Sequence, residues 1–310
     1  MRIVFMGTPD FAVPSLQALL DNGHDVCGVF TQPDKPKGRG HKLCFTPIKE
    51  LAIKSNIIVF QPPTLKSDDV FRQIELLNPD LIVVVAYGKI LPKAILDFPK
   101  NKCINVHASL LPKYRGAGPI QWSVLNGEKK TGVSTMFMAQ GIDTGDILLQ
   151  SETLIGENET ASELQSRLSV LGADLLIKTI KSLEKEELKP IAQNDSESSY
   201  APILTKELCE LDYNLTAQEL HNKIRGLNEW PCATTTFMGS RLKIYKSEIV
   251  DISTDEKPGM LICNKTFVVA CGKNTAIRFT LIQPEGSKRM TSQDYLRGKR
   301  PLINEMCGLK

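Results

Sequence analysis

The first half of the chain alternates nearly continuous apolar runs with helical patterns. Apolar runs occur at residues 2–7, 25–31 and 103–109, and amphipathic helical spacing occupies 14–23 and the first part of 71–88. Buried strands alternating with helices are typical of a mostly parallel sheet covered on both faces, an α/β, Rossmann-like domain. In such a sheet ligands bind beyond the carboxyl ends of the strands, at a topological switch point.

The pattern changes after a long predicted helix. Thr160 and Glu163 have the spacing of a capping box, and leucines recur at helical spacing up to Leu183. Residues 188–202 are polar and contain two prolines, which is typical of an extended linker.

The last third of the chain has short strand-like segments. One helix is predicted first, capped by Thr216 with Glu219 in the box position, and strands separated by glycine and asparagine turns follow it. Such a pattern is typical of a small barrel. We therefore predict an α/β domain at 1–187, a linker at 188–205 and an OB-like β-barrel domain at 206–310.

The composition is that of a globular protein. The chain has 310 residues, of which 42% are hydrophobic and 24% are charged, enough for two cores. The first residues, MRIVFMGTPD, are too short an apolar run for a signal peptide, and no stretch approaches the roughly 20 apolar residues of a membrane span. We expect a cytoplasmic monomer with no membrane partner.

The cysteine and histidine spacings do not favour a metal or a disulfide framework. The eight cysteines are scattered without a CxxC pair, so reduced thiols are expected. The four histidines form no HxxxH or HExxH spacing, and we predict no metal. Residues 206–310 carry 16 Lys and Arg against 12 Asp and Glu, which permits a polyanionic partner without requiring one.

Several common sites are absent from the sequence. The first strand is followed by MGTPDFAVP, which has one glycine where a dinucleotide fingerprint needs three. The chain contains neither the GxxxxGK[ST] pattern of a phosphate-binding loop nor the GxSxG pattern of a nucleophile elbow. These absences disfavour a nicotinamide enzyme, a P-loop ATPase and a serine hydrolase.

Polar residues at alternate positions end the apolar run at 103–109. In a strand Asn105, His107 and Ser109 would share one face. An asparagine amide and a histidine are donors that can hold a developing oxyanion. A carboxylate to orient the imidazole could come from Asp143 or Asp146, although both lie beside glycine and could equally serve the turn.

Five segments together resemble one enzyme family. They are FMGTPDFAVPSL, TQPDKPKGRGHKL, VVVAYGKILP, INVHASLLPKYRGAGPIQW and GIDTGDILL. They resemble the methionyl-tRNA formyltransferases, within the wider 10-formyltetrahydrofolate-dependent formyltransferase family, along essentially the whole chain. The resemblance implies transfer of a formyl group from the cosubstrate 10-formyltetrahydrofolate to the α-amine of methionyl-initiator tRNA in translation initiation, without a metal.

The resemblance also implies roles for particular residues. The catalytic asparagine, histidine and aspartate of the family fall on Asn105, His107 and Asp143, which selects one of the two aspartates. The folate-binding positions fall on Ser109, Leu110, Leu111, Pro112, Tyr87 and Gly88. The tRNA-contacting basic loop of the family falls on Lys35, Lys37, Arg39 and Lys42.

Four alternative functions have the same catalytic core or the same charge pattern. A glycinamide ribonucleotide formyltransferase would need neither the second domain nor the basic loop, and formyl-folate hydrolases usually carry a preceding regulatory domain. A sugar-nucleotide formyltransferase also has a small domain after the core and is harder to separate. A non-catalytic RNA-binding protein would have no reason to hold Asn105, His107 and Asp143 together.

Overall fold

The computed structural model describes residues 1–37 and 42–308 and divides the chain into two compact units. The first comprises Met1–Gly116, Lys130–Leu154 and Gln165–Ala201, and the second comprises Ala117–Lys129, Ile155–Leu164 and Pro202–Lys310. Two short segments that precede the predicted linker therefore group with the C-terminal part of the chain. The domain limits at 187 and 206 stay a prediction.

The first unit is built on a seven-stranded sheet. Its strands are β1 (Arg2–Gly7), β2 (Asp25–Phe30), β5 (Val59–Phe60), β6 (Leu81–Val85), β7 (Cys103–His107), β9 (Lys130–Phe137) and β10 (Ile147–Leu154). In the order β10-β9-β7-β6-β1-β2-β5, the last five strands are parallel, and β9 and β10 form an antiparallel edge. The predicted α/β, Rossmann-like fold class is confirmed, with an antiparallel edge that the pattern did not predict.

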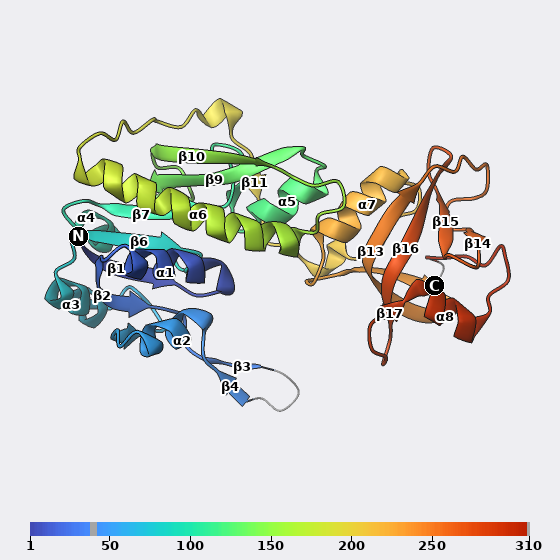
Figure 1. The fold of residues 1–310 in the computed structure, drawn as a ribbon, viewed down its shortest axis with the longest axis horizontal. Coiled ribbons are helices and arrows are strands. Elements are labelled where there is room, and N and C mark those ends of the chain that lie inside the picture. Colours follow the sequence, from blue (N-terminus) through green and yellow to red (C-terminus); the bar gives the residue numbers. More distant parts are fainter. Residues whose placement is uncertain (38–41, 309–310) are drawn as a thin grey trace. The chain divides into compact units, whose positions relative to one another are not determined.

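Helices cover both faces of this sheet (Figure 1). They are the 3-10 turn η1 (Asp10–Ala12), α1 (Val13–Asp21), α2 (Pro47–Lys54), α3 (Asp68–Leu77), α4 (Lys93–Asp97) and α6 (Ala161–Glu184). The helix α6 packs on β7 closely enough that a Cβ on Gly172 would lie 3.0 Å from Val106. On the opposite face, Ile74 of α3 and Ile95 of α4 share a buried apolar cluster with Val84 of β6. This second face is the one that carries the polar end of β7.

The strand order creates a switch point in the middle of the sheet. The chain runs from β1 through β2 to β5 on one side, and then returns to build β6 and β7 on the other. At the carboxyl ends of β1 and β6, Gly7 lies opposite Val85. The connections leave in opposite directions here, so a crevice for a ligand is expected beyond these two strands.

Two small sheets accompany the main one. The strands β3 (Lys35–Lys37) and β4 (Lys42–Cys44) form an antiparallel hairpin that extends from the first unit (Figure 1). The strands β8 (Arg115–Gly116) and β11 (Tyr200–Ala201) pair in parallel, and the 3-10 turn η2 (Asp195–Glu197) precedes β11. The predicted linker thus contributes a strand to the first unit.

The second unit is a curled antiparallel sheet. Its elements are α5 (Pro119–Leu125), η3 (Lys206–Leu208), α7 (Ala217–Gly226), β12 (Ala233–Phe237), β13 (Ser240–Val250), β14 (Leu261–Cys263), β15 (Val268–Cys271), β16 (Thr275–Pro284), β17 (Met290–Thr291) and α8 (Ser292–Lys299). The order is β12-β13-β16-β15-β14, with β17 beside β16. Bridges from Cys307 to Phe237 and from Met306 to Met260 join the two edges, which gives the sheet its half-barrel form.

The local signals in the sequence correspond to real caps and a real core. Thr160 and Glu163 exchange hydrogen bonds of 2.9 and 3.3 Å between side chain and backbone, and Thr216 and Glu219 form the second capping box. All eight cysteines are free thiols. Phe267 has no exposed surface and belongs to the core of the second unit.

A buried histidine makes the stability of the second unit depend on pH. The Nε2 of His221 donates to the Glu157 carbonyl at 3.1 Å, and Nδ1 accepts from the Ser247 hydroxyl at 3.0 Å. Burial lowers the pKa of His221 below the ordinary 6.5. The unfolded chain therefore binds the proton more readily, and stability falls as pH drops below about 6.5, by up to about 1.4 kcal/mol per pH unit.

The variant His221→Gln isolates this contribution, because the glutamine amide can still donate to Glu157 but does not titrate. We expect urea unfolding between pH 5 and 7 to show a shallower fall in stability for the variant than for the parent chain. Parallel stability curves for the two proteins would show that His221 is not responsible.

Candidate active site

The strand β7 carries Asn105 and His107 on one face. Their register neighbours are Met136 and Ser134 of β9, and the intervening Val106 faces α6, as the alternation predicts. Both polar side chains are largely buried, at 9% exposed for Asn105 and 6% for His107. The strand ends at His107, so Ser109 lies in the following turn and is not part of the ladder.

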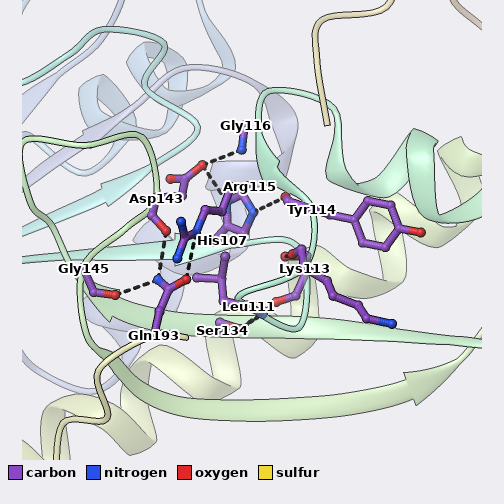
Figure 2. Close-up of polar contacts among 11 residues, drawn as sticks. His107, Leu111, Lys113, Tyr114, Arg115, Gly116, Ser134, Asp143, Gly145 and Gln193 are labelled. Atoms are coloured by element: carbon purple, nitrogen blue, oxygen red, sulfur yellow. Dashed lines mark hydrogen bonds and ion pairs between the residues drawn. The ribbon is translucent and has the colours of Figure 1, made fainter. Parts of the chain in front are cut away.

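His107 is held at both ring nitrogens (Figure 2). Its Nε2 lies 2.9 Å from the carbonyl oxygen of Tyr114, and its Nδ1 lies 3.6 Å from Oδ2 of Asp143. A carbonyl can only accept, so Nε2 carries a proton. A second proton on Nδ1 would face the carboxylate. The distance of 3.6 Å is longer than a hydrogen bond, so an Nδ1–H group could donate to a reacting group instead.

Asp143 reaches the imidazole from an unusual backbone conformation. Its φ is 52°, in the left-handed region, and Tyr114, which supplies the other partner of His107, has φ 61°. The Asp143 carboxylate also accepts a hydrogen bond of 2.8 Å from the backbone N–H of Gly116. Asp146 is exposed, and its backbone carbonyl accepts from Phe137. Only Asp143 therefore reaches His107.

The Asn105 amide has no hydrogen-bond partner among the residues that the structure describes. The side chain is largely buried but keeps a small exposed surface, so its amide group stays open to a reacting group. Its N–H₂ group lies on the same strand face as the His107 ring. The pair can present two donors to one developing negative charge.

The segment Ser109–Pro112 forms a turn tied to β9. The Ser109 hydroxyl donates to the Lys113 carbonyl at 2.6 Å, and its own carbonyl accepts from the Ser134 hydroxyl at 2.6 Å. The backbone N–H of Leu111 donates to the Ser134 hydroxyl, and the Gln150 side-chain amide donates to the Leu111 carbonyl at 2.9 Å. The Ser109 side chain thus fixes the turn directly after β7.

The loop after β6 is fixed in a similar way. The Tyr87 carbonyl accepts from the Thr8 hydroxyl at 3.2 Å and from the Gln32 amide at 3.1 Å, and the Gly88 carbonyl accepts from Gln32 at 3.2 Å. The Tyr87 ring is 2% exposed and packs in the apolar cluster, where burial raises its pKa to about 12. Within the described part of the chain its hydroxyl has no partner.

Comparison with known proteins identifies the family. A family model described as formyl transferase matches residues 1–180, and one described as formyl transferase, C-terminal domain, matches 203–300. The chain belongs to the formyl transferase family. Within this family, the chain is 55% identical to the methionyl-tRNA formyltransferase of Alkaliphilus oremlandii over 300 residues. These residues cover 96% of each of the two chains.

Other formyl transferases are also similar. The methionyl-tRNA formyltransferase of Caldanaerobacter subterraneus subsp. tengcongensis is 50% identical over 300 residues, covering 96% of this chain and 97% of that protein. Among solved structures, a sugar 3N-formyl transferase crystallised with dTDP and 5-N-formyl-THF superposes with a TM-score of 0.68. It is 23% identical and covers 93% of this chain and 99% of its own, which shows a shared fold.

The basic hairpin of this formyl transferase is anchored by a polar cluster at its base. The Lys49 ammonium donates to the Asp34 carboxylate and to the amide oxygen of Gln61. The amide nitrogen of Gln61 donates to the other carboxylate oxygen of Asp34 at 2.8 Å. Lys49 holds the pKa of the Asp34 carboxyl below its usual value. Lys35 is exposed in β3 next to this cluster.

Three further residues are predicted to meet tRNA, and the structure describes the backbone of two of them. Lys37 and Lys42 lie in β3 and β4, and Arg39 lies outside the described residues.

No helix of the described chain is long and apolar enough to cross a membrane. In the same residues no group of three or more His, Cys, Asp and Glu could hold a metal ion.

The sequence did not indicate the residues that fix the loops around His107 in this formyl transferase. Gln32 is the second residue after β2, and that position near a carboxyl strand end was the one available signal. Gln193 and Ser199 lie in the predicted linker, and they contact the loops on either side of His107. Nothing in a polar segment without periodicity indicates such long-range contacts.

Proposed function

We propose that this chain transfers the formyl group of 10-formyltetrahydrofolate to the α-amine of methionyl-initiator tRNA, giving the formylated initiator for translation. The observation that carries the chemistry is the cluster of Asn105, His107 and Asp143 at the end of β7. The acceptor follows from the relatives, named methionyl-tRNA formyltransferase, at 50% identity or more over nearly the full chain.

Asn105 and His107 would stabilise the charge that develops during transfer. The amine attacks the formyl carbon and forms a C–N bond, and the carbonyl oxygen gains negative charge before the bond to the folate nitrogen breaks. The unpaired Asn105 amide and the Nδ1–H of His107 would donate to this oxygen. One such donor is worth about 3 kcal/mol in comparable sites.

Asp143 would orient the His107 imidazole and move a proton. Its carboxylate lies 3.6 Å from Nδ1 and is held by the Gly116 amide, so its position beside the ring is fixed. The attacking amine must lose a proton, and the folate nitrogen must gain one when the C–N bond breaks. Asp143, through a water, would carry this proton between the two nitrogens.

The folate cosubstrate would lie across the ends of β6 and β7, which are neighbours in the sheet. Tyr87 and Gly88 follow β6 at the switch point, and the turn Ser109–Pro112 follows β7. Backbone groups of both loops are held by side chains from other segments, Gln32 after β2 and Ser134 of β9. Preformed loops at adjacent strand ends suit a flat ring system that must present its formyl group to Asn105 and His107.

The tRNA would meet the basic hairpin and the second unit. Residues 206–310 carry a surplus of positive charge, and Lys35, Lys37, Arg39 and Lys42 gather in one short segment. Basic side chains bind the phosphate backbone and release counterions from it.

We further propose that the protein acts as a cytoplasmic monomer.

The hairpin provides a prediction that separates tRNA from folate. Lys35→Ala should weaken formylation of methionyl-tRNA and reduce the slope of log K against log salt by about one, because one phosphate contact is lost. Folate affinity should not change. Lys178→Ala, on the exposed side of α6, is the matched control and should leave the slope unchanged.

Both Lys35 and Lys178 variants are measured by formyl transfer at several salt concentrations, with folate binding measured separately. The same series on Arg39→Ala should show weaker use of methionyl-tRNA at unchanged folate affinity. Poor folate binding with normal tRNA use in these variants would place the hairpin in the folate pocket instead.

The acceptor is tested by competition between substrate classes. The purified chain is incubated with 10-formyltetrahydrofolate and either methionyl-initiator tRNA or an amino-sugar nucleotide, and the formylated product is identified by mass spectrometry. We expect formyl-methionyl-tRNA as the product. Formylation of the amino sugar alone would assign the chain to the sugar-nucleotide enzymes, and binding of RNA without transfer would make it a binding protein.

A further inference from the structure

The polar segment between the two predicted domains is bonded to the catalytic loops along its length. We call residues 191–201 the strap. At its start, Ile191 and Ile147 exchange two backbone hydrogen bonds of 2.9 Å. At its end, β11 pairs with β8, directly after the turn that follows His107. The strap therefore lies against both loops that supply partners to His107.

One side chain of the strap connects these two loops. The Gln193 amide donates to the carbonyl of Asp143 at 2.8 Å and to the carbonyl of Gly145 at 2.7 Å, and its oxygen accepts from Nε of Arg115 at 3.0 Å. Figure 2 shows Gln193 beside Asp143 and Gly145, on the side of Asp143 away from Gly116. Both amide hydrogens are used, so the contact depends on the amide group itself.

The two partners of His107 are fixed by the strap from different sides. The carbonyl that His107 bonds belongs to Tyr114, whose own N–H donates to the Ser199 hydroxyl at 2.9 Å. The carboxylate that faces His107 belongs to Asp143, whose left-handed backbone is held by Gln193. Tyr114 and Asp143 both have left-handed backbone conformations, which persist only where the surroundings hold them. In the strap, Ser199 holds the backbone of Tyr114 and Gln193 holds that of Asp143.

We propose that Gln193 is a positioning residue that sets the spacing between the Asp143 carboxylate and the His107 imidazole. The inference rests on the proposed function, since it names a residue that supports the same transfer. Arg115 completes the contact, because the residue is only 9% exposed and its guanidinium also pairs with Asp195 at 2.8 Å. An amide is needed because only it offers two donors to carbonyls and an acceptor to a cation on one planar group.

The test compares Gln193→Ala and Gln193→Glu with the parent chain. Each variant should lower kcat about tenfold or more, since a small misplacement of a catalytic group is costly. The KM values for folate and methionyl-tRNA should change less than about twofold, because the Gln193 amide is occupied by the backbone carbonyls of Asp143 and Gly145 and by Arg115. Glutamate keeps the length of the side chain and the contact with Arg115, so it serves where the alanine variant does not fold.

A second readout needs no catalysis. The Gly116 N–H bonds the Asp143 carboxylate, so its hydrogen exchange should accelerate in both Gln193 variants. Glu197→Ala is the matched control: Glu197 is exposed on the strap and bonds Asn194, and this variant should leave kcat and exchange unchanged.

Unchanged Gly116 exchange in the Gln193 variants, or parental kcat despite faster exchange, would overturn the positioning role. If the parent chain itself fails to formylate methionyl-tRNA, the proposed function fails, and the exchange measurement still decides whether Gln193 holds the Asp143 loop.

Discussion

Asn105→Ala is expected to lower kcat about a hundredfold or more while leaving the fold intact. The amide has no partner among the described residues, so its removal leaves no other group unsatisfied in the free protein. Its donor would act on the oxygen that becomes charged in the transition state, and loss of such a donor falls on kcat. Turnover at saturating substrates, together with the midpoint of thermal unfolding, measures both parts.

His107→Ala should lose a similar or larger factor in kcat, but with a cost in stability. The Tyr114 carbonyl loses its donor, and an unsatisfied buried acceptor costs about 1–3 kcal/mol. Asn105→Ala is therefore the cleaner of the two variants. Near-parental turnover in either would remove that residue from the charge-stabilising role.

Asp143→Asn is expected to lower kcat about a hundredfold, because a general acid–base group contributes at least that much. The asparagine oxygen can still accept from the Gly116 N–H, and the backbone contact with Gln193 is kept. The substitution thus removes the charge beside His107 and preserves the loop. Steady-state kinetics would show the loss in kcat at little-changed KM.

Asp146→Asn is the matched control for this charge. Asp146 lies three residues further along the same turn, is exposed, and contributes its backbone carbonyl to the bond with Phe137. Its variant should retain kcat within about twofold, since the backbone bond is unaffected. Equal losses in the two variants would mean that the turn, and not the charge of Asp143, supports catalysis.

Much of the fold follows from local pattern. The apolar run at residues 2–7 predicts a strand, and β1 has the same limits. The spacing of Thr160 and Glu163 predicts a helix cap, and their hydrogen bond forms one. Both depend on neighbours within a few residues, where side-chain period and backbone capping are decisive. The alternation at Asn105 and His107 likewise placed both on one face.

The contacts between distant segments could not be read in this way. The choice of Asp143 over Asp146 came from the resemblance to a family, because either residue type suits a glycine-rich turn. Gln193 contacts Asp143 across 50 positions of the chain, and a polar stretch with two prolines indicates only a linker. Such contacts depend on which loops the sheet order brings together, and no local period encodes that order.

Formyl transfer by the parent chain and by the Asn105→Ala, His107→Ala double variant tests the proposed site most directly. Each protein is mixed with 10-formyltetrahydrofolate and methionyl-initiator tRNA, the aminoacyl group is released, and formyl-methionine is quantified, with folate binding measured in parallel. We predict formyl-methionine from the parent chain, and a loss of at least a hundredfold in the double variant at unchanged folate affinity. Comparable product from both proteins, or none from the parent chain, would contradict a transfer centred on the end of β7.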